Sequence, residues 1–162
     1  MQTLRIWLAD YIEHAFRRAT LGDGTSIYRA ESIDDYGNPL EDELDQTAER
    51  IDWRRVPNAD LLKRNWALHH LDAKGFRFYT PAILTMMIDP QNRSSMLMDT
   101  FLFRLIRVNC DCMIGNECFH SIFNASQRAA IIRFLKFAQH NEPRGFNDVD
   151  VRRALEVVKR CS

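Results

Sequence analysis

Apolar residues recur at helical spacing through most of this chain, and that periodicity constrains the fold more than any other feature of the sequence. Near the amino terminus the apolar side chains return every three or four residues, so they fall on one face of a helix. That face consists of Leu4, Trp7, Leu8, Tyr11, Ile12, Ala15 and Phe16. The spacing predicts an amphipathic helix over residues 3–18.

Capping residues and similar patterns predict the later helices. Thr25 or Ser26 can cap a short second helix. Asn124, followed by Gln127 three positions later, forms a variant of the capping box that begins a helix over residues 125–140. Further helices are expected over residues 40–52, 59–73, 81–88, 95–108 and 148–160.

The helix over residues 95–107 is apolar nearly all round, so we expect it at the centre of the molecule, beside the helix over residues 125–138. The chain has 162 residues, of which 46% are hydrophobic, which is enough for one ordinary core. The prediction is an all-α fold, a single compact domain over residues 1–162 with about six or seven helices.

The stretch HHLDAKGFRFYTPAILTMMI, residues 69–88, has the composition of a catalytic motif, but its pattern is better explained by a change of chain direction. Gly75 stands where a helix can end in a left-handed residue. Phe76–Tyr79 would then form an extended link, and Thr80–Pro81 would cap and begin the next helix. On this interpretation, Gly75→Ala should destabilise the fold by about 1 kcal/mol.

The formal net charge is zero, but acidic and basic residues are unevenly distributed. Residues 1–60 carry 13 Asp and Glu against 7 Lys and Arg, whereas residues 61–162 carry 9 against 15. We interpret the two halves as packing against each other, with an acidic surface for a basic partner as the alternative. The acidic helix over residues 40–52 has few apolar residues, so residues 41–49 are expected to be largely exposed.

The composition also limits the partners and the location of the protein. A net charge of zero argues against a nucleic-acid partner, and no stretch reaches the ~20 apolar residues of a membrane span. Asp10 and Glu13 interrupt the apolar start of the chain, unlike a signal peptide. Four cysteines fit a cytoplasmic protein as thiols. We therefore expect a cytoplasmic protein whose partner is another protein, while homo-oligomerisation stays open.

The strongest metal-like cluster is a loop with the pattern C-x-C-x5-C-x-H, formed by Cys110, Cys112, Cys118 and His120. Thiolates and an imidazole could hold zinc in a tetrahedral site. The spacing is not a standard zinc motif, however, because zinc knuckles usually start with C-x2-C. In the alternative interpretation, the cysteines are small buried hydrophobes beside a core helix.

No sequence motif assigns a catalytic residue. The chain contains no G-x-S-x-G, P-loop, G-x-G-x-x-G or H-E-x-x-H pattern, so an enzyme is the less favoured class. A partner-binding surface is predicted instead around Trp53, Arg54 and Arg55, because they lie in a connector and Trp and Arg are enriched at interface hot spots. The alternative is that Trp53 folds inward and anchors its loop.

The segments DAKGFRFYTPAIL and FNASQRAAIIRFLKF resemble a family of short, stand-alone bacterial proteins catalogued as a domain of unknown function. Residues 26–37, SIYRAESIDDYG, and residues 52–56, DWRRV, are similar to its earlier segments. The resemblance covers roughly residues 20–140. It implies a bacterial intracellular protein without an assigned activity, and it supplies no catalytic residues.

Two classes of function remain after these observations. The first is a small interaction or regulatory protein, such as an immunity-type or adaptor protein, which binds another protein through its surface. The second is a metal-binding or redox protein that uses the Cys110, Cys112, Cys118 and His120 loop, with zinc as the possible cofactor. A stoichiometric metal that is lost in Cys110→Ser would favour the second class.

Overall fold

The helical periodicity of the sequence is realised as a series of α-helices joined by short connections. The computed structural model describes residues 2–89, 91, 95–107, 113–114, 117–141 and 148–160. Their elements are α1 (Gln2–Phe16), α2 (Ile27–Asp34), α3 (Pro39–Gln46), η1 (Trp53–Arg55), α4 (Asn58–Lys63), η2 (Trp66–His70), α5 (Ala73–Ile88), α6 (Ser95–Arg107), β1 (Met113–Ile114), β2 (Glu117–Cys118), α7 (Phe119–Ile122), α8 (Ala125–Asn141) and α9 (Asp148–Arg160).

The all-α prediction is confirmed, although the described helices are more numerous than the six or seven expected. The difference arises from short segments such as the four-residue α7, which sequence periodicity does not reveal. Within the described residues, strand structure is confined to the two-residue pair β1 and β2, which run antiparallel with Met113 opposite Cys118. This small hairpin does not change the fold class.

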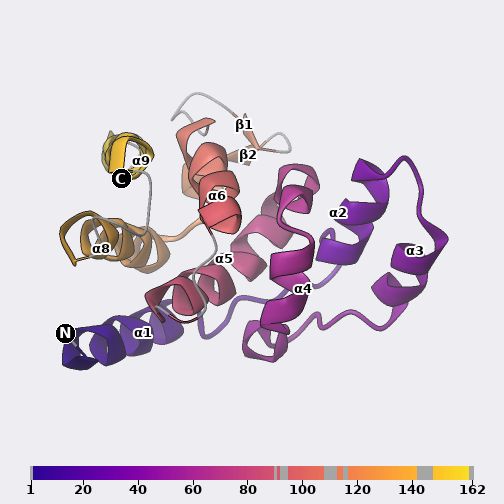
Figure 1. Ribbon diagram of the computed structural model, residues 1–162, viewed down its shortest axis with the longest axis horizontal. Coiled ribbons are helices and arrows are strands. Elements are labelled where there is room, and N and C mark those ends of the chain that lie inside the picture. Colours follow the sequence, from indigo (N-terminus) through magenta and orange to yellow (C-terminus); the bar gives the residue numbers. More distant parts are fainter. Residues whose placement is uncertain are drawn as a thin grey trace.

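Figure 1 shows α5 in the middle of the molecule, with helices on both sides of it. On one side lie α1, α8, α9 and α6, which pack as neighbours in the pairs α1–α8, α8–α9 and α6–α9. On the other side lie α2, α3 and α4, and the η2 segment packs against both α2 and α6. The buried apolar residues of both sides form one continuous core.

The two helices predicted at the centre, α6 and α8, flank α5 and each bury one apolar face. The apolar side chains of α6 and α8 that the sequence assigned to the core are almost fully enclosed. These are Leu97, Phe101, Leu102 and Leu105 on α6 and Ile131, Phe134, Leu135 and Ala138 on α8. The capping box of α8 also forms, because the Gln127 amide donates to the Asn124 side chain and the Asn124 amide donates to Gln127 Oε1.

The structure contradicts the change of direction predicted within residues 69–88. A single helix, α5, runs from Ala73 to Ile88, and Gly75 lies in its first turn rather than at a helix end. Asp72 is the N-cap, and its carboxylate accepts the Gly75 amide at 2.7 Å. The proposed extended link and the helix start at Thr80–Pro81 were therefore wrong, because burial of Phe76, Phe78 and Tyr79 on all sides favours one central helix despite Pro81.

Gly75 is required here by a close approach and not by a left-handed backbone. A Cβ atom at this position would lie 2.4 Å from the carbonyl oxygen of Thr25. The Asp72 carboxylate also accepts the Thr25 amide at 3.1 Å, so it ties the loop before α2 to the start of α5. The glycine therefore marks where the α2 side of the molecule meets the central helix.

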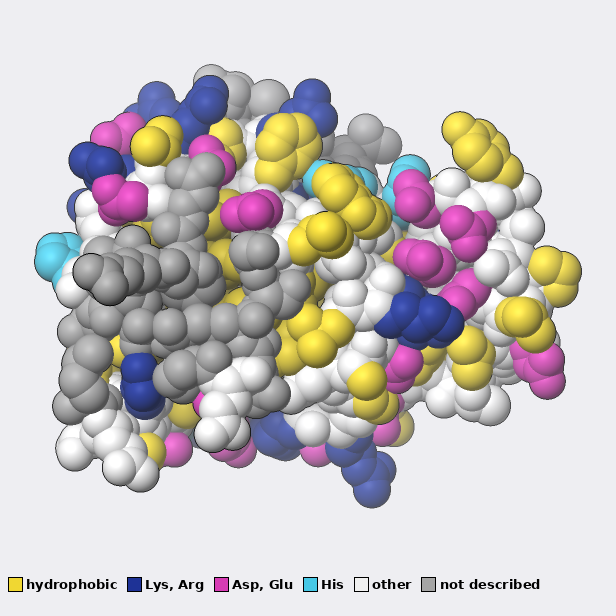
Figure 2. Space-filling view, in the orientation of Figure 1, with side chains coloured by type: hydrophobic (Ala, Val, Ile, Leu, Met, Phe, Trp, Pro, Cys, Tyr) yellow, Lys and Arg dark blue, Asp and Glu magenta, His cyan; other side chains and the backbone are white. Residues whose placement is uncertain are grey.

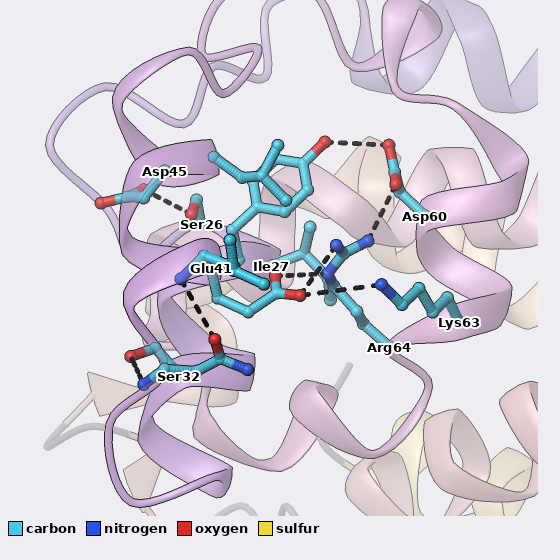
Figure 3. A network of polar contacts seen from close by, with 12 residues as sticks. Ser26, Ile27, Ser32, Glu41, Asp45, Asp60, Lys63 and Arg64 are labelled. Carbon is cyan, nitrogen blue, oxygen red and sulfur yellow. Dashed lines mark hydrogen bonds and ion pairs between the residues drawn. The ribbon is translucent and has the colours of Figure 1, made fainter.

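A polar network fastens α3 to α4, and Figure 3 shows it from close by. The Arg64 guanidinium donates to both Glu41 oxygens, at 2.7 and 3.0 Å, and to Asp60 Oδ1 at 2.8 Å. Both Arg64 and Glu41 are buried. Tyr28 donates its hydroxyl proton to Asp60 at 2.8 Å and lies under the Arg64 guanidinium. Burial, followed by the Asp60 hydrogen bond, raises the pKa of Tyr28 to about 12.

This network corrects part of the prediction for the acidic helix. Residues 41–49 were expected to be largely exposed, but only Glu43, Leu44, Gln46 and Thr47 are exposed. Glu41 is buried because it is the partner of Arg64, and the other four are half-buried. The helix also ends at Gln46 instead of residue 52. Beyond it Arg50 turns back and donates to the Gly22 and Gly24 carbonyl oxygens, at 3.1 and 3.0 Å, and to Asp45 at 2.8 Å.

Candidate functional site

Three aromatic side chains meet at the surface where η2 packs against α6. The rings of Trp66 and His69 lie 6.1 Å apart, and His69 meets Phe103 edge to face at 5.4 Å. The guanidinium of Arg107 covers the Phe103 ring at 4.9 Å. Trp66 and His69 come from η2 and Phe103 from α6, so the cluster depends on the contact between these two elements.

These rings border a surface groove with a volume of about 580 Å³. The groove is lined by Trp66, His69, Met96, Asp99, Thr100, Phe103 and Asp150. The large apolar side chains remain accessible, since Trp66 is 56% exposed, Met96 49% and Phe103 46%. Figure 2 shows hydrophobic side chains gathered over α6 and the adjacent segment before α5, with histidine side chains beside them. We call this region the aromatic groove.

Arg104 holds the floor of the aromatic groove in place. Its side chain is buried, and the guanidinium donates to the carbonyl oxygens of Leu68 and Leu71 at the end of η2. It also lies over the Phe76 ring at 4.8 Å. Burial lowers the pKa of Arg104 to about 10, partly offset by Asp72. The arginine therefore fixes η2 on α6 through uncharged acceptors and sets the spacing of the aromatic rings.

Two carboxylates lie among the apolar side chains of the groove. Asp99 on α6 and Asp150 on α9 both line it. Partial burial, and then the negative charge of Asp150, raise the pKa of Asp99 above its ordinary value. The groove therefore combines accessible aromatic rings with an acidic spot that a cation would relieve.

His69 adds a ring that is neutral at neutral pH. Burial, followed by the positive charge of Arg104, lowers the pKa of His69 below its ordinary value. A neutral imidazole stacks against aromatic side chains without placing a cation among them. The negative charge of the two aspartates is consequently not cancelled by His69.

The groove does not assemble an acid–base pair from the histidine-rich stretch. His69 faces Phe103, whereas His70 contacts Asp34 at 3.0 Å and Asp72 caps α5. The three side chains therefore serve three different places. No group of three potential metal-ligating side chains occurs among the residues that the structure describes.

The structure places Trp53 inside the molecule. Its side chain is 4% exposed, and its indole nitrogen donates to the Phe16 carbonyl oxygen at 3.1 Å. The inward alternative therefore describes Trp53, and its ring cannot contact a partner. Arg54 pairs with Asp52 at 3.0 Å, while Arg55 is the most exposed of the three predicted residues. Partner binding through Arg54 and Arg55 stays a prediction.

The predicted metal ligands fall outside what the structure describes. Cys110 and Cys112 are outside the described residues, and the side chains of Cys118 and His120 are likewise not described. Zinc binding by this loop stays a prediction. Elemental analysis of the purified protein, beside Cys110→Ser, tests it: stoichiometric zinc that is lost in the variant supports the site, whereas metal-free native protein contradicts it.

Sequence analysis did not identify the aromatic groove. Trp66 was assigned to the core stripe of one long helix over residues 59–73, but the chain there divides into α4 and η2 and leaves its ring outside. A signal was present in α6, which is apolar nearly all round. Met96 and Phe103 fall beside the core stripe formed by Leu97, Phe101, Leu102 and Leu105, and this excess of apolar residues indicates a second contact face.

The fold and the groove define a small all-α protein with a concave surface cluster of accessible aromatic side chains beside two carboxylates. The chain matches the model described as "Family of unknown function (DUF6714)" over residues 5–158, and it belongs to this family. No curated protein and no solved structure matches the chain. Within the part of the chain that the structure describes, no helix is both long and apolar enough to cross a membrane.

Proposed function

We propose that this protein is a small binding module that docks a segment of another protein in the aromatic groove. The observation that carries the proposal is the exposure of Trp66, Met96 and Phe103 around one cavity. Soluble proteins rarely leave large apolar side chains clustered in a concave surface without a ligand for them. Reversible docking of this kind fits a regulatory role, like that of an immunity or adaptor protein, in the bacterial cytoplasm.

The chemistry of the groove favours a protein segment with an apolar anchor. Trp is the side chain most typical of interface hot spots, and Met adapts its shape to different partners. The rings of Trp66 and Phe103 are held apart by His69, so an aliphatic or aromatic side chain can enter between the walls of the groove. A cavity of about 580 Å³ accepts one or two such side chains rather than a whole domain.

The two carboxylates of the groove indicate which charge the partner segment should carry. Asp99 and Asp150 line the same cavity, and the negative charge of Asp150 opposes ionisation of Asp99. A Lys or Arg beside the apolar anchor would relieve this repulsion. We therefore expect the partner segment to be a short amphipathic helix or peptide that carries a basic residue within one helical turn of its apolar anchor.

A peptide-display selection tests the proposal without knowledge of the natural partner. The native protein is used to select from a library of helical peptides in which apolar, basic and acidic positions vary independently. We expect enrichment of peptides with an apolar anchor and an adjacent basic residue. Enrichment of acidic peptides, or the absence of any enrichment, would contradict the proposal.

Matched variants locate the binding to the groove. Phe103→Ala and Met96→Ala shorten exposed groove side chains, whereas Ile51→Ala shortens an even more exposed apolar side chain that does not line the groove. An enriched peptide should lose about tenfold or more in affinity for the groove variants and bind Ile51→Ala like the native protein. Equal binding to all variants would place the peptide elsewhere, and self-association that Phe103→Ala abolishes would identify the occupant as a second copy of the chain.

A further inference from the structure

A second cavity lies on a different part of the molecule, where the end of α1, the first half of α5 and the beginning of α8 meet. Its volume is about 470 Å³. The lining is mostly polar and consists of His14, Ala15, Arg17, Arg18, Ala19, Thr20, Arg77, Ser121, Ile122, Asn124, Ser126 and Gln127. It contains three arginines and no carboxylate, although the chain as a whole has equal numbers of acidic and basic residues.

The arginines of this cavity differ from those that form ion pairs elsewhere in the protein. Elsewhere Arg29, Arg50, Arg54, Arg64 and Arg152 each pair with a carboxylate. Within the described residues, by contrast, Arg17, Arg18 and Arg77 have no ion pair with a carboxylate. Arg77 has a long contact of 3.5 Å from Nη1 to the Ile122 carbonyl oxygen. Three guanidinium groups therefore converge on one cavity without an internal counter-charge.

The other side chains of the cavity add hydrogen-bonding groups. Ser121, Ser126 and Thr20 are exposed hydroxyl residues that line it beside the arginines. The beginning of α8, whose Gln127 amide is already capped by Asn124, contributes the positive end of a seventeen-residue helix. The helix end strengthens the positive field, but the three arginines around one concave surface define the site.

We propose that this cavity binds a small phosphate-bearing molecule. Guanidinium groups offer paired N–H donors in a planar fork that matches the oxygens of a phosphate, and three of them balance a ligand with two or more negative charges. An open cavity of about 470 Å³ fits a compact ligand better than a nucleic-acid backbone, which follows an extended basic surface. The proposal is independent of the aromatic groove, because the two cavities share no lining residue.

Isothermal titration with inorganic pyrophosphate tests this site in the full chain. We expect saturable binding that is weakened about tenfold or more in Arg77→Gln and in the double variant Arg17→Gln with Arg18→Gln. Arg152→Gln, which removes an exposed arginine on α9, is the matched control and should bind like the native protein. Equal affinity of all four proteins would overturn the proposal.

A second variant separates loss of binding from loss of folding. Ser126→Asp places a negative charge at the cavity in the first turn of α8, where an acidic residue is compatible with the helix. Because the variant loses the hydrogen bond from the Ser126 hydroxyl to Asn124 Oδ1, we expect a slightly lower melting temperature, a protein that is still folded at the assay temperature, and loss of pyrophosphate binding. Retained pyrophosphate binding in Ser126→Asp would contradict a site in this cavity. Loss of binding to the native protein in sodium chloride of matched ionic strength would show a non-specific charge interaction and would also contradict it. Tighter binding of a phosphoserine peptide or an oligonucleotide than of pyrophosphate would overturn the assignment to a small molecule.

Discussion

The helices on the two sides of the central helix α5 are held together by different kinds of interaction. On one side, α2, α3 and α4 are joined by the buried ion pair of Glu41 and Arg64 and by the hydrogen bonds of Asp60 and Tyr28 (Figure 3). On the other side, α6, α8 and α9 pack mainly through buried apolar side chains, among them Leu102 and Ile131. The first side is specified by directed contacts and the second by shape and volume.

This difference predicts how each side responds to substitution. A buried charge without its partner is strongly unfavourable, so the polar side should fail abruptly when one group is removed. An apolar core loses stability in proportion to the volume removed, so the apolar side should respond gradually. The aromatic groove lies where the two sides meet, because η2 packs against α2 on one side and α6 on the other.

The largest effect is expected from Arg64→Met. This variant removes the buried counter-charge of Glu41 and leaves only the exposed Lys63, whose Nζ lies 3.9 Å from Glu41 Oε1. It should lower the free energy of unfolding by about 3–5 kcal/mol. Denaturation in urea measures the loss. The control is the double variant Glu41→Leu with Arg64→Met, which removes both charges and should recover most of the stability. A single variant as stable as the native protein would mean that the ion pair does not fasten this side.

A smaller effect is expected from Gly75→Ala, at the seam between the two sides. The added Cβ would meet the Thr25 carbonyl oxygen, so the loop and α5 must separate, at a cost of about 1–3 kcal/mol. Gly22→Ala is the comparison, because Gly22 has a positive φ but open space around it. Its stability loss measures backbone strain without the steric crowding expected at Gly75. If thermal melting showed Gly75→Ala to be neutral or stabilising, the close approach of the two sides would be wrong.

Ile131→Val tests the apolar side with a single methylene. Ile131 is fully buried on α8, and its truncation should lower the free energy of unfolding by only about 0.5–1.5 kcal/mol. Urea denaturation is again the measurement, with the slope against urea concentration as the check for two-state unfolding. A loss comparable to that of Arg64→Met would remove the contrast between the two sides.

The smallest effect is expected from Asp99→Asn in the groove. The pKa of Asp99 is higher in the folded protein than in the unfolded chain. Ionised Asp99 therefore destabilises the fold at a pH above its folded-state pKa. At low pH, where the carboxyl is protonated in the folded and the unfolded protein alike, it has no such effect. The variant should therefore be slightly more stable than the native protein at pH 7, by about 0.5 kcal/mol or less, and equal to it near pH 3. Melting curves at both pH values decide this, and a variant that is less stable at pH 7 would refute it.

Much of the fold followed from the sequence because local signals and tertiary packing agree there. The amphipathic pattern of α1, the Ser26 cap of α2 and the capping box of α8 all use contacts within a few residues. The helices α6 and α8 were predicted correctly because their apolar stripes are wide, but α5 lies at the centre instead of this pair. Such features are fixed by periodicity and capping chemistry alone.

The errors arose where distant contacts decide the local structure. Gly75 and Pro81 are ordinary helix breakers, yet α5 continues through both because it is buried on all sides. Glu41 could not be distinguished from its exposed acidic neighbours before Arg64 was placed beside it, twenty-three residues away. The groove was missed for the same reason, since Trp66, Met96 and Asp150 come together only when η2, α6 and α9 are packed.

The most direct test of the docking proposal uses fluorine NMR of protein labelled with 5-fluorotryptophan. The chain contains Trp7, Trp53 and Trp66, and Trp-to-Phe variants assign their resonances. On titration with a groove-selected peptide, the Trp66 resonance should shift, while those of the buried Trp53 and the distant Trp7 stay in place. A shift of the Trp53 or Trp7 resonance with Trp66 unchanged would contradict docking in the aromatic groove.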